Sequence, residues 1–161
     1  MRVRLNPGTI KKFGRTAWRY QRTYQIPAGK NVARFASAII QALEEARDAN
    51  LTVDNLVFEP EHLKTLIGSN EMHLEHDVTI EVEGRDALIQ VLEAAMKDIG
   101  DFLFVPRPKR FVLYADRNQR ATFFSQSAAS LNKMSEFLSN EGFQELPVRR
   151  RAQHPEAVER R

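Results

Sequence analysis

Basic side chains are concentrated near the N-terminus of this chain, where their spacing suits the chemistry of phosphate binding. Residues 1–34 contain nine Lys or Arg and no Asp or Glu, so this stretch has a charge of +9. Residues 35–100 carry fourteen acidic and four basic side chains (−10), and residues 101–161 carry eleven basic and seven acidic ones (+4), which together account for the net charge of +3. Clustered Lys and Arg neutralise phosphates and release their counterions. Segment 1–34 is therefore a candidate site for a polyanion.

Aromatic side chains are interleaved with these cations. From Arg15 to Ile26 the residues alternate, and Trp18, Tyr20 and Tyr24 share one face, interrupted by Arg22. Alternation with period two predicts a half-buried strand, in which such aromatics ordinarily pack into the core. On an exposed strand they would instead form a platform on which bases stack.

A second compact basic site is the sequence Pro-Arg-Pro-Lys-Arg at residues 106–110. Its prolines stiffen the turn and hold three cations in a shape suited to phosphate or carboxylate, although a solubilising hairpin tip has the same composition. The sequence nominates these candidate nucleic-acid-binding residues: Arg15, Trp18, Arg19, Arg22, Lys30, Arg34, Arg107, Lys109 and Arg110. Arginine dominates this set and suits phosphate forks and stacking, so nucleic acid is the first expected partner, with RNA and DNA left open.

Two other interpretations of the basic segment stay open. The cations could dock on an acidic protein surface, including the acidic middle of a second copy, which would make the chain a protein-interaction module or a homo-oligomer. They could also lie beside acidic strands of the same sheet and have no binding role. Salt separates these hypotheses only partly, because it weakens every electrostatic contact. Adding nucleic acid separates them properly.

The strongest metal candidate is the run from Glu71 to Asp77, with His62 upstream. In a strand, His73, Glu75 and Asp77 would share one face; in a helix, His73 and His76 would do so instead. Because the two geometries select different ligands, we expect solvated side chains here, and neither a metal nor another cofactor.

Signals for catalysis are weaker still. Ala28-Gly29-Lys30 precedes a predicted helix but lacks the other residues of a phosphate-binding loop, so it offers at most one anion contact. Asp116 follows a predicted strand, where a carboxylate ordinarily closes a turn. The sequence has no Gly-x-Ser-x-Gly elbow and no cysteine, which excludes thiolate metal sites, disulfides and cysteine nucleophiles. A metal-dependent or acid/base enzyme is the third hypothesis, behind a non-enzymatic binding protein.

The elements that would position these residues follow from periodicity. Apolar spacing predicts helices from Asn31 to Asn50, from Pro60 to Gly68, after Gly84, and from Ser125 or Ser127 to Gly142. Strands are predicted at residues 15–26, 51–58, 76–83, 102–105, 111–114 and 143–148, and residues 121–124 could extend the pairing. From residue 77 to 148 the order is β-α-β-β-α-β, the ferredoxin-like order of an α+β (α/β) fold, extended by an N-terminal β-α-β-α segment.

Length and composition set the remaining expectations. The 161 residues predict a single domain over 1–148, which includes the basic segment 1–34, followed by a basic and flexible tail at 149–161 that opens with Arg149-Arg150-Arg151. Nothing resembles a secretory signal or a membrane span, so we expect a cytoplasmic protein without a membrane partner.

Overall fold

The computed structural model describes residues 1–69 and 73–147. In this part of the chain one antiparallel sheet of eight strands combines with five helices in an α+β fold. The elements, in chain order, are β1 (Arg2–Leu5), α1 (Thr9–Arg15), β2 (Tyr20–Gln25), α2 (Asn31–Ala42), β3 (Asp48–Asn55), α3 (Glu61–Ile67), β4 (Val78–Glu83), α4 (Arg85–Lys97), β5 (Asp101–Arg107), β6 (Val112–Ala115), β7 (Arg120–Ser125), α5 (Ala128–Asn140) and β8 (Glu145–Leu146).

The strands of the sheet lie in the order β1-β4-β3-β5-β6-β7-β2-β8. Two β-α-β units are each split by a strand from elsewhere in the chain. Strands β4 and β5, joined by α4, lie on either side of β3, and strands β7 and β8, joined by α5, lie on either side of β2. Strand β6 pairs with both β5 and β7 and so joins the two units into one sheet.

The ferredoxin-like topology predicted for residues 77–148 is not confirmed. Residues 120–125 form a full strand, β7, so the order after Asp77 is β-α-β-β-β-α-β. The strands of this region also do not form a sheet by themselves, because β3 and β2 are inserted between them. The alternation of strands and helices is confirmed as an α+β architecture.

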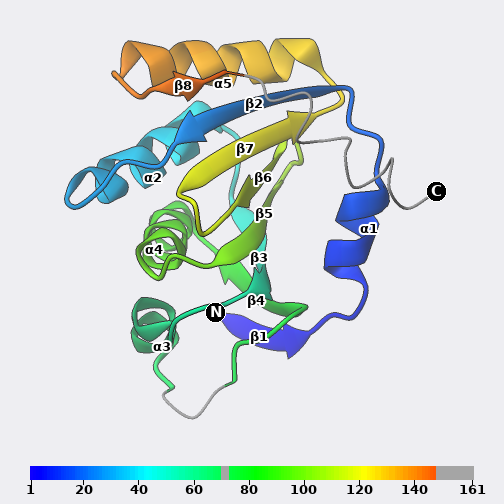
Figure 1. Ribbon diagram of the computed structural model, residues 1–161, viewed down its shortest axis with the longest axis vertical. Helices are drawn as coiled ribbons and strands as arrows, with labels where there is room; N and C mark the ends of the chain where they lie inside the picture. The colour runs from blue at the N-terminus through cyan, green and yellow to red at the C-terminus, as the bar shows by residue number, and fades with distance from the viewer. Residues whose placement is uncertain (70–72, 148–161) are drawn as a thin grey trace.

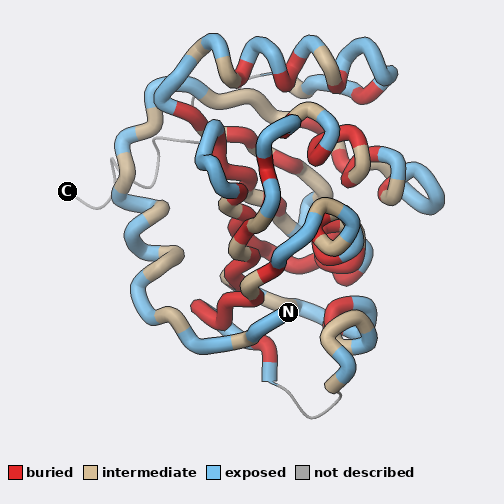
Figure 2. The backbone as a smooth tube through the Cα atoms, turned by 180° about the vertical axis from the view of Figure 1, so that it is seen from behind, coloured by how far each residue is buried: buried red, intermediate tan, exposed pale blue. Residues whose placement is uncertain are grey.

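The core lies between one face of the sheet, here called the inner face, and helices α2, α4 and α5. Alternate residues such as Leu51, Ile80 and Phe104 are fully buried on the inner face, opposite one another in register. Helix α1 lies on the other side of the sheet from α2, α3 and α4 (Figure 1). Figure 2 shows no buried residue in α1, whereas α2 and α4 each have a buried side.

Several boundaries differ from the predicted ones. Strand β1 and helix α1 were not predicted, and Arg15 ends α1 instead of opening a strand. Helix α2 ends at Ala42, because the chain turns at Leu43 and Asn50 already belongs to β3. Among the described residues no helix is both long and apolar enough to cross a membrane.

Candidate functional site

The outer face of the sheet, opposite the core helices, carries a cluster of four aromatic rings under α1. The ring of Phe13 from α1 stacks on Tyr114 of β6, with centroids 5.5 Å apart and an interplanar angle of 6°. The same ring meets Phe124 of β7 edge-on at 5.3 Å. Trp18, in the connection to β2, lies 6.1 Å from Phe13 and 6.0 Å from Phe124. These contacts pack α1 against the outer face of the sheet.

A carboxylate fixes the start of α1. Asp77, just before β4, accepts hydrogen bonds from the backbone N–H of Gly8 at 2.8 Å and of Ile10 at 3.1 Å. Burial by itself raises the pKa of Asp77, but these two hydrogen bonds and the positive charge of His76 outweigh burial, and the pKa falls below its usual value. The ionised carboxylate therefore satisfies N–H groups of the first turn.

Asp77 belongs to a polar cluster beneath α1. His76 Nδ1 donates to the carbonyl oxygen of Asp54 at 3.0 Å and lies 3.2 Å from Asp54 Oδ1. The hydrogen bond to this carbonyl, followed by the charges of Asp77 and Asp54, raises the pKa of His76. Asp54 also accepts the Tyr114 hydroxyl in a short hydrogen bond. Burial, reinforced by that bond, raises the pKa of Tyr114 well above its ordinary value.

The residues of the predicted metal run thus have different roles in the structure. Asp77 and His76 hold α1 to the sheet, whereas His73 and Glu75 are exposed. Among residues 1–69 and 73–147 no three His, Asp or Glu side chains are grouped closely enough to hold a metal ion. Glu71, the first residue of the predicted run, lies outside the described residues.

Beside the aromatic cluster lies an open cavity of about 750 Å³, between α1 and the outer face of β7, β2 and β8. Rings of Phe13, Trp18 and Phe124 form one part of its lining, and hydroxyl, amide, guanidinium and carboxylate groups form another. The polar lining residues are Thr16, Gln21, Thr23, Asp116, Arg120 and Thr122. The indole Nε1 of Trp18 is buried and has no hydrogen-bond partner among the described residues, which is costly unless something supplies an acceptor.

The exposed side of α1 is cationic. Lys11, Lys12 and Arg15 lie on this helix and Arg19 follows it, and all four residues are exposed. None of them forms an ion pair with any residue of the described chain. Because residues 1–34 contain no Asp or Glu, these charges also lack an acidic neighbour in sequence. We call these four residues the α1 cationic face.

Two other candidates from the basic segment have structural partners. Arg22 lies on the inner face of β2, where its guanidinium donates to Asn132, to Ser135 and to Glu145 at 3.0–3.2 Å. Arg34 donates to the carbonyl of Glu141 at 2.8 Å and lies over the ring of Phe143 at 4.4 Å. Both arginines therefore join elements of the fold to one another.

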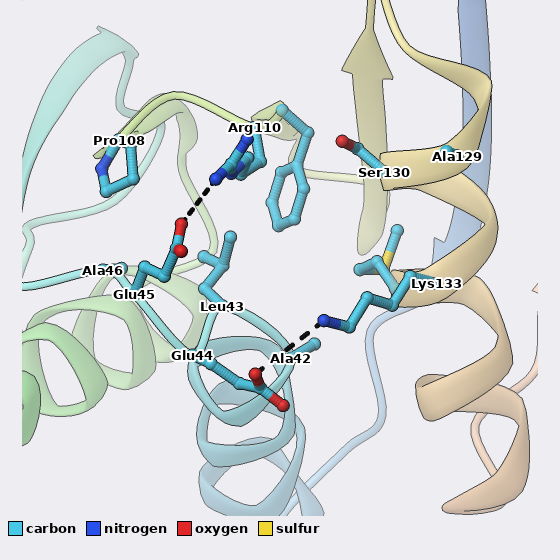
Figure 3. Close-up of a pocket in the computed structure, with 12 residues that line it drawn as sticks. Ala42, Leu43, Glu44, Glu45, Ala46, Pro108, Arg110, Ala129, Ser130 and Lys133 are labelled. Carbon is cyan, nitrogen blue, oxygen red and sulfur yellow. Dashed lines mark hydrogen bonds and ion pairs between the residues drawn. The ribbon is translucent and has the colours of Figure 1, made fainter.

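The 106–110 site is largely neutralised by acidic residues. Arg107 pairs with Asp48 at 2.5 Å, and Arg110 pairs with Glu45 at 2.5 Å. The hydrogen bond and charge of Arg110 lower the pKa of Glu45. Figure 3 shows this pair on the wall of a pocket of about 260 Å³, where Lys133 of α5 also faces Glu44. Lys109 is exposed and forms no ion pair with a described residue.

The nine nominated residues do not gather on one surface. Arg15 and Arg19 precede β2, whereas Lys30 and Arg34 follow it, so the six residues of β2 separate the two pairs. At the rise of a β-strand that separation is about 20 Å. Of the nine, only Trp18 lines the cavity, and Arg15 and Arg19 adjoin lining residues in sequence. The arginines 149–151 lie outside the described residues.

Local structure explains the acid/base candidate Asp116 and also His62, which lies upstream of the predicted metal run. Asp116 accepts the backbone N–H of Asn118 at 2.9 Å and of Arg120 at 3.3 Å, which closes the β6–β7 turn. His62 bonds Asp98 at 2.8 Å, and Asp98 also accepts the N–H groups that begin α3. These two carboxylates stabilise a turn and a helix start.

Sequence reasoning missed most of the cavity. Lys11, Lys12 and Arg15 follow a helical i, i+1, i+4 spacing, which could have indicated a cationic helix face. Phe124 and Arg120 come from a strand distant in sequence, and no local signal links them to Trp18.

Comparison with protein-family models, with curated proteins and with solved structures finds no match to this chain.

Proposed function

We propose that this chain is a non-enzymatic binding protein that engages single-stranded nucleic acid along the α1 cationic face. The observation that carries the proposal is the contrast between these four cations and most of the other basic side chains. Lys11, Lys12, Arg15 and Arg19 are exposed without an ion-pair partner among the described residues, and the half-buried rings of Phe13 and Trp18 belong to the same segment. Free cations of this kind gain most from phosphate contact, because no internal pair has to be broken.

Most of the other described basic groups have partners within the fold, although Lys30 and Lys109 are exposed and form no ion pair with a described residue. Arg2 and Arg4 both bind Glu81, each at 2.7 Å. Arg85 donates to four backbone carbonyls at the end of α2 and in the turn after it. A phosphate would have to compete with these partners. The proposal therefore keeps Arg15, Trp18 and Arg19 from the sequence-based set and adds Lys11 and Lys12. It gives Arg22, Arg34, Arg107 and Arg110 structural roles and does not include Lys30 and Lys109.

The alternative is a protein-interaction module or a homo-oligomer. Val57 and Phe58 after β3 favour it, because 51% and 61% of these residues is exposed, and exposed apolar side chains are common at protein interfaces. In this alternative the α1 cationic face would bind an acidic surface, of a partner or of a second copy.

The test is fluorescence anisotropy of a labelled 12-nucleotide single strand titrated with the full chain. The double variant Arg15→Glu/Arg19→Glu should bind about tenfold or more weakly, because two phosphate contacts become repulsive. The matched control Lys30→Glu/Lys109→Glu changes the net charge equally at two other exposed lysines and should bind within about twofold of the parent. The four phosphate contacts of the α1 cationic face alone should make log K fall with log salt at a slope of about −3.

The outcomes separate the hypotheses. Equal loss in both double variants would mean attraction by net charge without a site, and would contradict the proposal. Absence of binding, together with a mass of two or more chains by light scattering, would favour the homo-oligomer. Urea unfolding of each variant shows whether a loss of binding reflects a loss of folding.

A further inference from the structure

We infer that the cavity beside α1 binds one unstacked base of the bound strand, so that the protein contacts both the bases and the phosphates of a single strand. This inference rests on the proposed function and adds to it a second contact, between the cavity and a base. The α1 cationic face and the cavity share the segment from Phe13 to Trp18. Arg15 lies between the lining residues Gly14 and Thr16, and Arg19 follows the lining residue Trp18, so a strand bound at these two arginines is within reach of the cavity.

The aromatic lining suits a planar ring. Phe13 is held between Tyr114 and Phe124 in a stacked and an edge-on contact, so its orientation is fixed before any ligand arrives. Trp18 and Phe124 are tilted by 43° to each other with centroids 6.0 Å apart, and both line the cavity. Bases stack on such rings whatever their identity, because every base has a π face.

The polar lining suits the edge of a base. Thr23 and Thr122, opposite each other on β2 and β7, share a hydrogen bond of 3.0 Å between their hydroxyls and keep further capacity to donate or accept. The guanidinium of Arg120 can donate only. A cavity that combines aromatic side chains with a few convergent polar groups is typical of small-molecule binding sites.

Charge gives the strand an orientation. The lining carries one negative side chain, Asp116, and one positive one, Arg120, which offset each other. Lys11, Lys12 and Arg15 lie on α1 and Arg19 follows it, so the excess positive charge is on the helix side. The phosphates are therefore attracted to the helix side and the base is directed inward. The volume of about 750 Å³ falls within the usual range of roughly 300–1,000 Å³ for ligand sites.

The first experiment compares a 12-nucleotide thymidine strand with an abasic strand of the same length and charge. Trp18 is the only tryptophan of the chain, so its intrinsic fluorescence reports on this cavity alone. We expect the thymidine strand to quench Trp18 and to bind about tenfold more tightly than the abasic strand, which is the effect of one base on an aromatic platform.

The second experiment uses Phe124→Leu, which keeps an apolar side chain but removes a π face. Affinity for the thymidine strand should fall about tenfold, towards that of the abasic strand, while affinity for the abasic strand stays the same. The control Phe58→Leu makes the same change at an exposed phenylalanine outside the cavity and should affect neither. Urea unfolding and far-UV circular dichroism verify that Phe124→Leu is folded.

The inference and the proposed function fail in different ways. If both strands bind equally tightly and Trp18 emission does not change, the base inference is wrong and phosphate binding stands. If neither strand binds, the proposed function is wrong and the inference falls with it. Equal losses for both strands in folded Phe124→Leu would likewise overturn the base inference, because they would place Phe124 in phosphate binding.

Discussion

At the scale of single residues, a few ionisable groups hold α1 in place. Asp77 caps the helix start with two hydrogen bonds, and His76 lies between Asp77 and Asp54, with its Nε2 3.6 Å from Asp77 Oδ2. Neither contact is visible from the sequence, in which the same residues resemble metal ligands. The contact between residue 77 and residues 8–10 depends on β1 pairing with β4, which brings the two segments together.

His76 makes the stability of this attachment depend on pH. Its pKa is raised in the folded protein above an unfolded value of about 6.5. The contribution of protonated His76 to the free energy of unfolding is therefore fully present below about pH 6.5, and it is lost as the pH rises through the pKa of His76 in the folded protein. Because 58% of the side chain is exposed, the effect should stay below about 1 kcal/mol. Urea unfolding of the parent and of His76→Gln from pH 5.5 to 9 measures it.

The parent should exceed His76→Gln in free energy of unfolding at the low end of this range, and the difference should shrink as the pH rises. The control is His73→Gln, which replaces an exposed histidine three residues earlier. A difference that is constant between pH 5.5 and 9 would contradict the assignment of His76 to this cluster.

The sequence could not separate the basic residues that have a partner within the fold from those that have none among the described residues. Arg15 and Arg22 look alike in the sequence, but Arg22 points to the core side of β2 and reaches α5. The alternation of β2 already placed Arg22 on the same face as Tyr24. What the alternation could not show is that Glu145, 123 positions away, would be there to pair with it.

At the scale of elements, α1 is the part of the site that depends most on contacts with the rest of the fold. It has seven residues and none of them is buried, and so short a helix is not stable in water alone. Its position depends on Phe13 and on the cap from Asp77. The strands and core helices beneath it have their own buried contacts, so α1 can be perturbed without loss of the fold.

Phe13→Ala should therefore loosen α1 selectively. Removing a half-buried ring that contacts Trp18, Tyr114 and Phe124 should cost about 2 kcal/mol of unfolding free energy, less than a fully buried phenylalanine. Trp18 emission should shift to longer wavelength, because the indole loses its neighbour. Urea unfolding and emission spectra test this.

The control Phe58→Ala removes an exposed ring and should change stability by less than about 0.5 kcal/mol. Unchanged Trp18 emission in Phe13→Ala would show that the cluster does not hold α1.

Elements with long apolar periodicity were predictable, and short ones were not. Helices α2, α4 and α5 each present a stripe of buried residues, and β4 alternates cleanly. Strand β1 has only four residues and helix α1 only seven, with exposed side chains at most positions. Their sequences carry little periodicity, because their structure depends on contacts with β4 and with the outer face of the sheet.

At the scale of the whole molecule, long-range pairing decides where the charges lie. Strand β2 pairs with β7 and β8, about 100 residues later, and β3 separates β4 from β5. Local periodicity does not specify such insertions, which is why the predicted ferredoxin-like sheet was too simple. The same pairing distributes the +9 segment over β1 at one edge of the sheet and α1, β2 and α2 elsewhere, so its charges do not form one surface.

The segment after Pro147 provides the last test, because Pro147 lines the cavity and the next residues include Arg149-Arg150-Arg151. Residues 148–161 contain five Arg and two Glu, a charge of +3. A chain ending at Pro147 keeps every described element, so its unfolding free energy should change by less than about 0.5 kcal/mol. Its binding to a single strand should weaken, and the salt slope should become shallower by up to about 2.

Anisotropy titrations at several salt concentrations measure this, with Arg160→Gln/Arg161→Gln as a milder variant that removes only the two distal charges. Tighter binding by the shortened chain would contradict the prediction, because it would mean that these arginines compete with the nucleic acid. An unchanged affinity and slope would contradict it as well, and would confine phosphate binding to α1. A graded loss, smaller for the distal pair than for the whole segment, is the expected result, because counterion release scales with the number of phosphates neutralised.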